Sequence, residues 1–139
     1  MPISLADALK VSHAALAEAE ARGITKLSVV VTDPGGHVRT AMRTDGQGIF
    51  GVQTATAKAV TALGFNRPTL ALTPLFTDQA TAAIAGATGG NFAPLGGGVV
   101  ILDADGEIVG AAAISGGLPN VDHEIIVAVV EAQGFTTIP

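Results

Sequence analysis

The sequence predicts an α+β domain in which helices cover an antiparallel sheet, and three observations favour this class. Two segments, 27–43 and 99–115, each contain an apolar run, a cluster of turn residues and a second run, as a β-hairpin does. Segments with helical periodicity flank both hairpins. Strands that follow each other directly pair antiparallel, whereas parallel strands need a long crossover. The 139 residues are enough for a single domain, 1–139, with its own core.

The first half of the chain predicts a helix and then a hairpin. Ser4 with Asp7 three residues later is a capping-box-like start, leucines recur at helical spacing, and Gly23 supplies a stop, which indicates a helix over 4–22. The hairpin has strands at 27–33 and 37–43 around the turn 33–36. Alternation along the second strand predicts one face made of His37, Arg39, Ala41 and Arg43, and an opposite face made of Val38, Thr40 and Met42.

The second half predicts two more helices, a glycine-rich loop, a second hairpin and a final helix. Small and β-branched residues over 49–65 indicate a closely packed helix, Pro68 forces an extended segment, and 75–85 is a short helix. Six glycines and one proline make 86–98 loop or irregular strand. The second hairpin pairs 99–102 with 107–115 around the turn 103–106. Asn120 is the expected cap of a helix that ends near Gln133.

The composition is apolar for a water-soluble domain. Only 14% of the residues are charged, against a usual value of about 25%, and the mean hydropathy is +0.51. Such a chain would expose large apolar patches as a monomer, so we expect a homo-oligomer. The net charge of −5 with seven cations excludes the run of phosphate contacts that nucleic-acid binding requires. There is no cysteine for a disulfide, a thiolate nucleophile or an iron–sulfur cluster.

Two further expectations concern the cellular location. The first seven residues, Met1 to Asp7, lack the basic patch and apolar core of a secretory signal, so we expect a cytoplasmic protein. The longest uncharged stretch, 79–102, is interrupted by Gly, Pro, Asn and Thr, and is therefore expected to be a buried segment and no membrane span.

The segment 46–51 matches the G-x-G-x-x-G motif of dinucleotide-binding turns, but its context argues against such a site. The strand before it closes a hairpin, and no acid follows at the place where one would hold a ribose. Ordinary loop glycines explain the motif.

Two cations are candidate anchors for an acidic ligand. Arg43 ends a strand beside Asp45 and a glycine-rich connection, where a guanidinium suits bidentate recognition of a carboxylate. Lys58 is the only charge between Asp45 and Arg67, among small residues that permit close approach. Its ammonium either extends to solvent or pairs with an acidic ligand group or a buried acid.

The start of the final helix is the candidate site for proton transfer. Ser115, Gly116 and Gly117 offer backbone amides to a carboxylate or oxyanion, and Asp122 or His123 would then act as general acid or base. The alternative is that the acids there only complement the helix dipole. A metal is not expected, because adjacent helical residues point in different directions.

The remaining histidines have ordinary explanations beside one functional alternative. His13 lies on the rim of the apolar stripe of the first helix, where a histidine is either structural or an axial ligand to haem. His37 belongs to a hairpin turn and is expected to be exposed.

Several blocks of the sequence, in their order and spacing, resemble the GlcG/HbpS family, which also occurs as the C-terminal domain of PduO-type proteins and is described as haem-binding. The blocks lie at 29–36, 43–46, 57–62, 96–99, 106–110, 114–117 and 122–124, so the resemblance spans nearly the whole chain. The family's usual Arg-Met-Asp block is Arg43-Thr44-Asp45 here, and its Gly-Val-Ser-Gly-Gly reads Ala113 to Gly117. His123 after Asp122 is also less usual for the family.

The resemblance implies a profilin-like, three-layer α/β/α fold with a five-stranded antiparallel sheet. It further implies dimers that assemble into larger oligomers, from tetramers to octamers. Haem is the implied cofactor, but the family shares no single axial ligand.

Three functions follow as hypotheses. The first is a protein that binds haem or a related tetrapyrrole, with His13 as axial candidate and with Arg43 and Lys58 for the propionates. The second is a catabolic lyase, hydratase or isomerase without an organic cofactor, in which a small carboxylated substrate meets the anion anchors and the amides of Ser115 to Gly117. The third is an assembly protein without chemistry. The low aromatic content, 4%, argues slightly against a dedicated haem pocket, whereas the resemblance argues for one.

Overall fold

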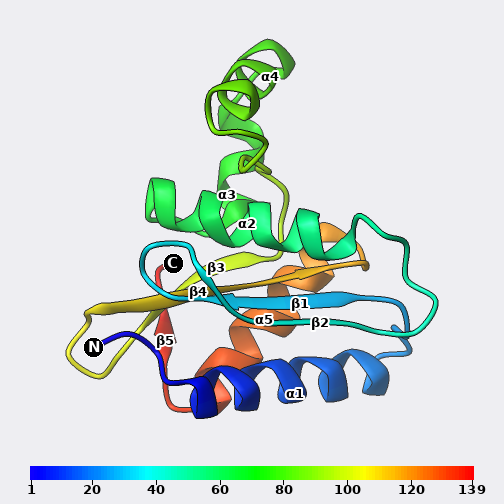
Figure 1. The fold of residues 1–139 in the computed structure, drawn as a ribbon, viewed down its shortest axis with the longest axis vertical. Helices are drawn as coiled ribbons and strands as arrows, with labels where there is room; N and C mark the ends of the chain where they lie inside the picture. Colours follow the sequence, from blue (N-terminus) through cyan, green and yellow to red (C-terminus); the bar gives the residue numbers. More distant parts are fainter.

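A sheet with helices on both faces forms the body of the computed structural model, which describes residues 1–139 (Figure 1). The helices are α1 (Leu5–Ala21), α2 (Gly51–Phe65), α3 (Thr69–Leu72), the 3-10 turn η1 (Thr73–Leu75), α4 (Asp78–Ala87) and α5 (Pro119–Ala132). The strands are β1 (Ser28–Thr32), β2 (Val38–Arg43), β3 (Gly98–Leu102), β4 (Ile108–Ser115) and β5 (Thr136–Thr137).

The five strands pair antiparallel in the order β2-β1-β4-β3-β5. The two hairpins, β1–β2 and β3–β4, therefore lie side by side and are joined through β1 and β4 at the centre of the sheet. Ser28, the first residue of β1, is opposite both Arg43 of β2 and Ser115 of β4. This register brings the end of two strands and the start of a third to the same end of the sheet.

The core lies on both faces of the sheet. Helices α1 and α5 pack against one face, where Val29, Val31 and Ile114 join the larger apolar cluster, and α2 covers the other face (Figure 1). Under α2 the contacts are made by small residues, with Ala55 and Ala59 against the strands. Because alanine has a short side chain, this helix lies close to the sheet, which agrees with the close packing that its sequence predicts.

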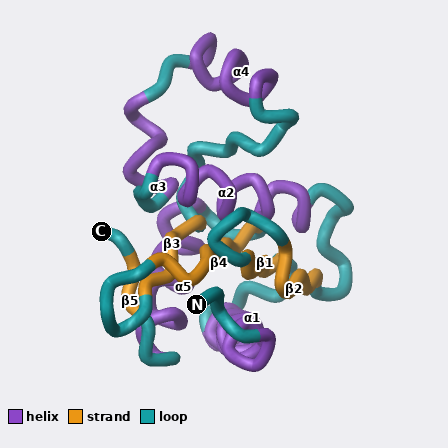
Figure 2. The backbone as a smooth tube through the Cα atoms, turned by 60° about the vertical axis from the view of Figure 1, so that its left-hand side comes forward, coloured by secondary structure: helices purple, strands orange, loops and turns teal.

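Between α2 and β3, the segment 69–95 extends away from the body and is called the arm here. It contains α3, η1 and α4, and both Figure 1 and Figure 2 show α4 at its far end, away from the sheet. The arm is attached to the body through Leu72 and Thr69, which are buried. No residue of α4 is buried, so the prediction that the uncharged stretch 79–102 is a buried segment is wrong over this helix. It holds for the strand β3, which lies inside the sheet.

The α+β class and the antiparallel five-stranded sheet are confirmed. Some element boundaries predicted from the sequence are wrong. Helix α5 begins at Pro119 with Leu118 as its N-cap, two residues before the expected cap Asn120, because proline suits the first helical position. The third predicted helix, 75–85, lies at Asp78–Ala87, where Thr77 supplies the side-chain cap. The short α3 and β5 have no periodic signal in the sequence.

The predicted alternation on the second strand is also wrong over part of its length. The register between β1 and β2 shifts at Val31/Thr32, so that Thr32 is opposite Val38 and Val31 is opposite Thr40. Arg39 is therefore the extra residue of a bulge, and Val38 lies on the same face as Ala41 and Arg43. Thr40 and Met42 do face α1: the Thr40 hydroxyl is 2.8 Å from that of Ser12, and Met42 packs on the core.

Among the helices, none combines the length and apolar character that a membrane crossing requires.

Candidate functional site

A polar cluster lies under the N-terminal end of α2, at the end of the sheet where β1 begins. Ser28 and Ser115 are opposite each other on adjacent strands and share the face that α2 covers, as do Val30 and Ala113 two residues further along. The Gln47 side chain joins them: its Nε2 donates to the Ser115 carbonyl at 2.8 Å, and the Ser28 hydroxyl donates to its Oε1. A side chain at Gly51 would collide with Gln47, so this position of α2 leaves room for the amide.

The buried ion pair of the protein lies next to this cluster. Lys58 of α2 and Asp122 of α5 are only 4% and 1% exposed, and Lys58 Nζ lies 3.6 Å from Asp122 Oδ2. The ammonium also donates to the Ile114 carbonyl at 2.9 Å, and Asp122 Oδ1 accepts from the Gly117 amide at 3.1 Å. The pair therefore connects α2 on one face of the sheet with α5 on the other, at the C-terminal end of β4.

Glycines surround the ion pair because no side chain fits there. A Cβ on Gly97 would lie 3.0 Å from the Asp122 Cβ and 3.1 Å from Lys58 Nζ, and Gly97 has a φ of +126°. A Cβ on Gly117 would lie 2.6 Å from Asp122 Oδ1. The glycine-rich sequence before β3, predicted as loop or irregular strand, thus forms one wall of the ion pair.

Burial moves both members of the pair toward their neutral forms. Desolvation lowers the pKa of Lys58, and the negative charge of Asp122 opposes this shift. Desolvation raises the pKa of Asp122, and Lys58 together with the Gly117 and Gly116 amides opposes it. Opposed pKa shifts in two buried groups that lie 3.6 Å apart occur at functional sites and also in structural ion pairs.

Two buried polar atoms at the start of α5 have no hydrogen-bond partner, Asp122 Oδ2 and His123 Nδ1. Most buried polar atoms in proteins are satisfied, so these two are exceptions. Burial also lowers the pKa of His123, with Glu124 opposing. His123 and Asp122 point in different directions, as adjacent helical residues do.

An open cleft of about 490 Å³ borders the ion pair on the side of α1 and α5. Its lining consists of Arg22, Ile24, Gly116, Gly117, Leu118 and Val121. The Arg22 guanidinium is held by Glu18 at 3.0 Å and by Glu124 at 3.1 Å. Gly117 separates the cleft from the Asp122 carboxylate, since its amide donates to that group.

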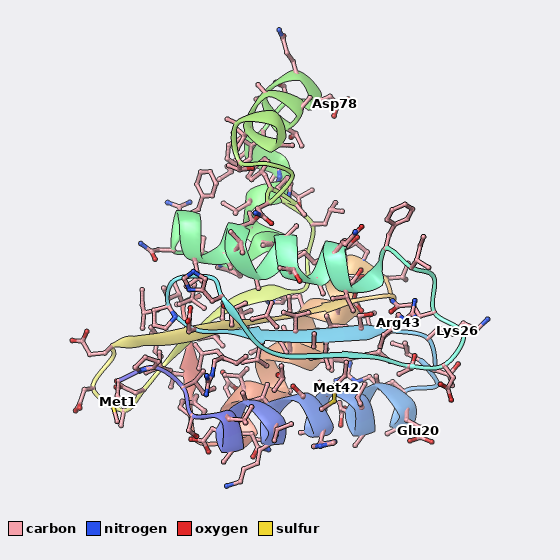
Figure 3. The ribbon with its side chains drawn as sticks, viewed as in Figure 1. Met1, Glu20, Lys26, Met42, Arg43 and Asp78 are labelled. Atoms are coloured by element: carbon pink, nitrogen blue, oxygen red, sulfur yellow. The ribbon has the colours of Figure 1, made fainter.

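Arg43 lies at the same end of the sheet but outside the buried cluster. It is exposed, on the face of β2 toward α2, and Figure 3 shows it near Lys26 at the end of the sheet that the 44–50 loop follows. Asp45 is exposed in that loop. Arg43 and Asp45 take part in no ion pair of the structure. Of the predicted anchors, the structure thus joins Lys58, Asp122 and the Ser115–Gly117 turn, and leaves Arg43 and Asp45 at the surface beside them.

His13 lies on another face of the molecule. It is exposed on α1, which covers the opposite side of the sheet from α2. His37, as expected, is exposed; it lies in the hairpin turn at the far end of β1, with its Nδ1 3.3 Å from Asp33 Oδ1. No group of three His, Cys, Asp or Glu side chains lies close enough together to hold a metal.

Sequence reasoning missed Ser28, Gln47 and Arg22. Gln47 stands between glycines in a loop, and its role depends on the pairing of β1 with β4, which brings Ser28 and Ser115 together. Arg22 is the C-cap residue of α1 and reaches the cleft only because α1 and α5 pack side by side.

A protein-family model described as haem-degrading protein HbpS-like matches the chain over residues 3–131. No curated protein sequence matches the chain.

Solved structures with the same fold include haem-related proteins. The crystal structure of a PduOC–haem complex superposes with a TM-score of 0.88 over the whole of both chains at 23% identity. The crystal structure of HbpS has 27% identity and a TM-score of 0.79, with 95% of this chain and 90% of that chain covered. A Klebsiella pneumoniae protein, ORFY, has 20% identity and a TM-score of 0.84, with 94% and 90% covered. At 23% and 20% identity the likeness to PduOC and ORFY concerns the fold alone.

Proposed function

Because this chain belongs to the HbpS-like family of haem-degrading proteins, which matches residues 3–131, we propose that it binds haem or a related tetrapyrrole, with His13 as the axial ligand. The observation that carries the proposal is the position of this histidine. The His13 imidazole is exposed on α1 and faces solvent, whereas His123 is half-buried and His37 lies beside an aspartate in a hairpin turn.

The surroundings of His13 suit a flat apolar group. Leu9 and Leu16 lie one turn before and after it on the same stripe of α1, and both are only half-buried. Leu16 and Met42 also pack on the core cluster, and Figure 3 shows Met42 on the side of β2 that faces α1. A histidine between apolar side chains offers the nitrogen ligand and part of the apolar surface that a haem requires.

The propionates of a haem bound at His13 require cations on the same side of the sheet as His13. Lys58 is buried with Asp122 under α2, and Arg43 faces the α2 side, so neither belongs to the His13 surface of the same protomer. Lys10, one turn before His13, is exposed and lies 3.9 Å from Asp7. We therefore assign Lys10 to a propionate in place of the two cations expected from the sequence. When bound, the iron would supply the redox chemistry, and His13 would hold it and set its potential.

Titration of the purified protein with hemin tests this proposal. The wild-type protein should give a saturable shift of the Soret band, and His13→Ala should abolish the shift or weaken binding at least about tenfold. His37→Ala, which removes another exposed histidine, is the matched control and should bind as the wild type does. Absence of saturable binding, or equal binding by His13→Ala, contradicts the proposal.

The buried ion pair favours a second candidate function, an enzyme without an organic cofactor that acts on a small carboxylated substrate. Asp122 and Lys58 have opposed pKa shifts and Asp122 Oδ2 has no hydrogen-bond partner, as expected of groups that exchange protons. Arg43 and the Ser115–Gly117 amides would bind the substrate's anionic groups, and Asp122, Lys58 or His123 would transfer the proton. Exchange of carbon-bound hydrogen for deuterium in a panel of small 2-oxo acids tests it. Wild-type protein should catalyse the exchange, whereas Asp122→Asn should not.

We further propose that the protein acts as a homo-oligomer in the cytoplasm. The low share of charged residues, 14%, supports the assembly.

A further inference from the structure

The arm, residues 69–95, ends in a helix, α4, that contacts other residues of the arm but has no buried residue of its own. None of the ten residues of α4 is buried, and both views of the backbone show this helix beyond α2 and the sheet (Figure 1, Figure 2). An isolated helix of this length is marginal in water even with a favourable sequence. The helix therefore needs a surface that covers it.

The arm is apolar and carries very little charge. Leu75 and Leu95 are 57% and 45% exposed, although the ring cluster of Phe65, Phe76 and Phe92 beside them is closely packed, with centroids 5.2 to 5.7 Å apart. A hollow of about 320 Å³ lies among these groups. Its lining includes Phe76, Phe92 and Leu95, and it also includes Asp78. The same arm thus carries an exposed leucine, Leu75, and a hollow with room for a leucine side chain of a partner.

Two opposite charges remain on the arm and at its base. Between Arg67 and Asp103 the only charged residue is Asp78, which begins α4, while Arg67 follows the last turn of α2. Both side chains are exposed, and neither takes part in an ion pair. Arg67 lies at the base of the arm and Asp78 lies further along it. When the arms of two copies lie antiparallel, each cation is therefore opposite the anion of the other copy.

We propose that the arm pairs with the arm of a second copy of this chain about a two-fold axis. In such an interface each contact occurs twice, so a leucine of each protomer enters the hollow of its partner. Arg67 of one protomer meets Asp78 of the other, and the reverse. A second copy is the occupant because the arm is nearly neutral and its own features complement each other, whereas a nucleic acid or a charged peptide requires a larger set of charges of one sign.

The arm is thus the surface through which the proposed homo-oligomer forms, and its pairing is independent of haem binding. Hemin titration tests His13 and charge reversal tests the arm, so either proposal can fail without the other.

Charge reversal with mixing tests the pairing, with sedimentation velocity over a range of concentrations as the measurement. Arg67→Glu alone places two acids together at both contacts, and Asp78→Lys alone places two cations together, so each variant should dissociate at least about tenfold more readily than wild type. Mixing the two variants should restore dimers of wild-type affinity. In the mixed dimer the introduced glutamate of one protomer meets the introduced lysine of the other, and the second contact is the native one between Arg67 and Asp78.

The matched controls are Lys26→Glu and Asp105→Lys, which make the same changes in net charge at exposed positions away from the arm. They should associate as the wild type does, alone and mixed. Circular dichroism verifies that every variant is folded. A wild type that is monomeric at all concentrations overturns the proposal. So does an assembly that both single variants leave unchanged, or a pair of variants whose weakened association mixing does not restore.

Discussion

At the residue scale, Lys58 and Asp122 are the two charged side chains that are buried. An ion pair that is fully desolvated does not in general stabilise a fold more than apolar residues of the same volume would. Removal of one partner is a different matter, because it leaves the other charge buried and alone. The 3.6 Å separation and the absence of a hydrogen bond to Asp122 Oδ2 mean that this pair is incompletely satisfied. Removal of either side chain alone should therefore cost more stability than removal of both.

Lys58→Met should lower the free energy of unfolding by about 3–5 kcal/mol at neutral pH, since methionine fills the space of the lysine and leaves Asp122 without a cation. Urea denaturation measures the change. The loss should shrink in acid, where Asp122 is protonated. The double variant Lys58→Met/Asp122→Leu should recover most of the stability, and Lys26→Met, at an exposed position, should stay within about 0.5 kcal/mol of wild type. Equal losses in the single and double variants would contradict this account.

His123 should make the stability depend on pH. Burial lowers the pKa of His123 in the folded state below its ordinary value of 6.5. Between these two pKa values the unfolded chain binds more protons than the folded one, so stability falls as the pH decreases from 6.5 toward the folded pKa. His123→Gln should remove this part of the pH dependence in a series of denaturation curves, whereas His13→Gln, at an exposed position, should keep it. An unchanged slope in His123→Gln would refute the assignment.

At the element scale, the glycines of the chain are not equivalent, because their surroundings differ. Gly97 combines a φ of +126° with close approaches to Asp122 and Lys58, whereas nothing lies within 4 Å of a Cβ on Gly64 in α2. At position 97 only glycine avoids backbone strain and a collision. At position 64 a glycine is not required, and it lowers the helix propensity of α2.

Gly97→Ala should therefore destabilise the protein by about 2 kcal/mol or more, from backbone strain and overpacking together. Gly64→Ala should stabilise it by about 0.5–1 kcal/mol. Thermal denaturation of the two variants side by side compares them. Similar shifts in both would show that the turn before β3 can relax without affecting the ion pair.

The elements that the sequence predicts well are those with a local signal. Ser4 and Gly23 frame α1, and the turn residues at 33–36 and 103–106 mark both hairpins. The bulge at Arg39 has no such signal, because it depends on the pairing partner in β1.

The candidate site divides in the same way. Asp122 and the Ser115–Gly117 turn are close in sequence and can be predicted together, whereas Gln47 and Ser28 meet only through the order of the strands. The small neighbours of Lys58 are compatible with a side chain that faces solvent and with one that faces an acid. In the structure, the packing of α2 on β4 buries Lys58 and places its ammonium beside Asp122.

At the scale of the whole molecule, the candidate functions lie on different surfaces. His13 is on the outer side of α1, the buried pair is at the end of the sheet between α2 and α5, and the arm extends beyond α2 (Figure 1). A ligand at one of these places does not cover the other two. The proposed haem binding, proton transfer and self-association can therefore be tested one at a time by substitution.

Arm pairing also predicts how heat stability depends on protein concentration. A partner that binds only the folded chain raises the unfolding midpoint as its concentration increases, so the midpoint of the wild type should rise on going from micromolar to millimolar chain. Leu75→Asp replaces a side chain that is 57% exposed and outside the core, so it should leave the midpoint of the dilute protein unchanged and abolish the rise. Leu5→Asp is the control, at a leucine that is 49% exposed at the start of α1. An acid is favourable in the first turn of a helix, so this variant should stay folded. Because Leu5 lies outside the arm, the rise of the midpoint with concentration should remain. A concentration dependence that survives in Leu75→Asp would mean that another surface holds the protomers together.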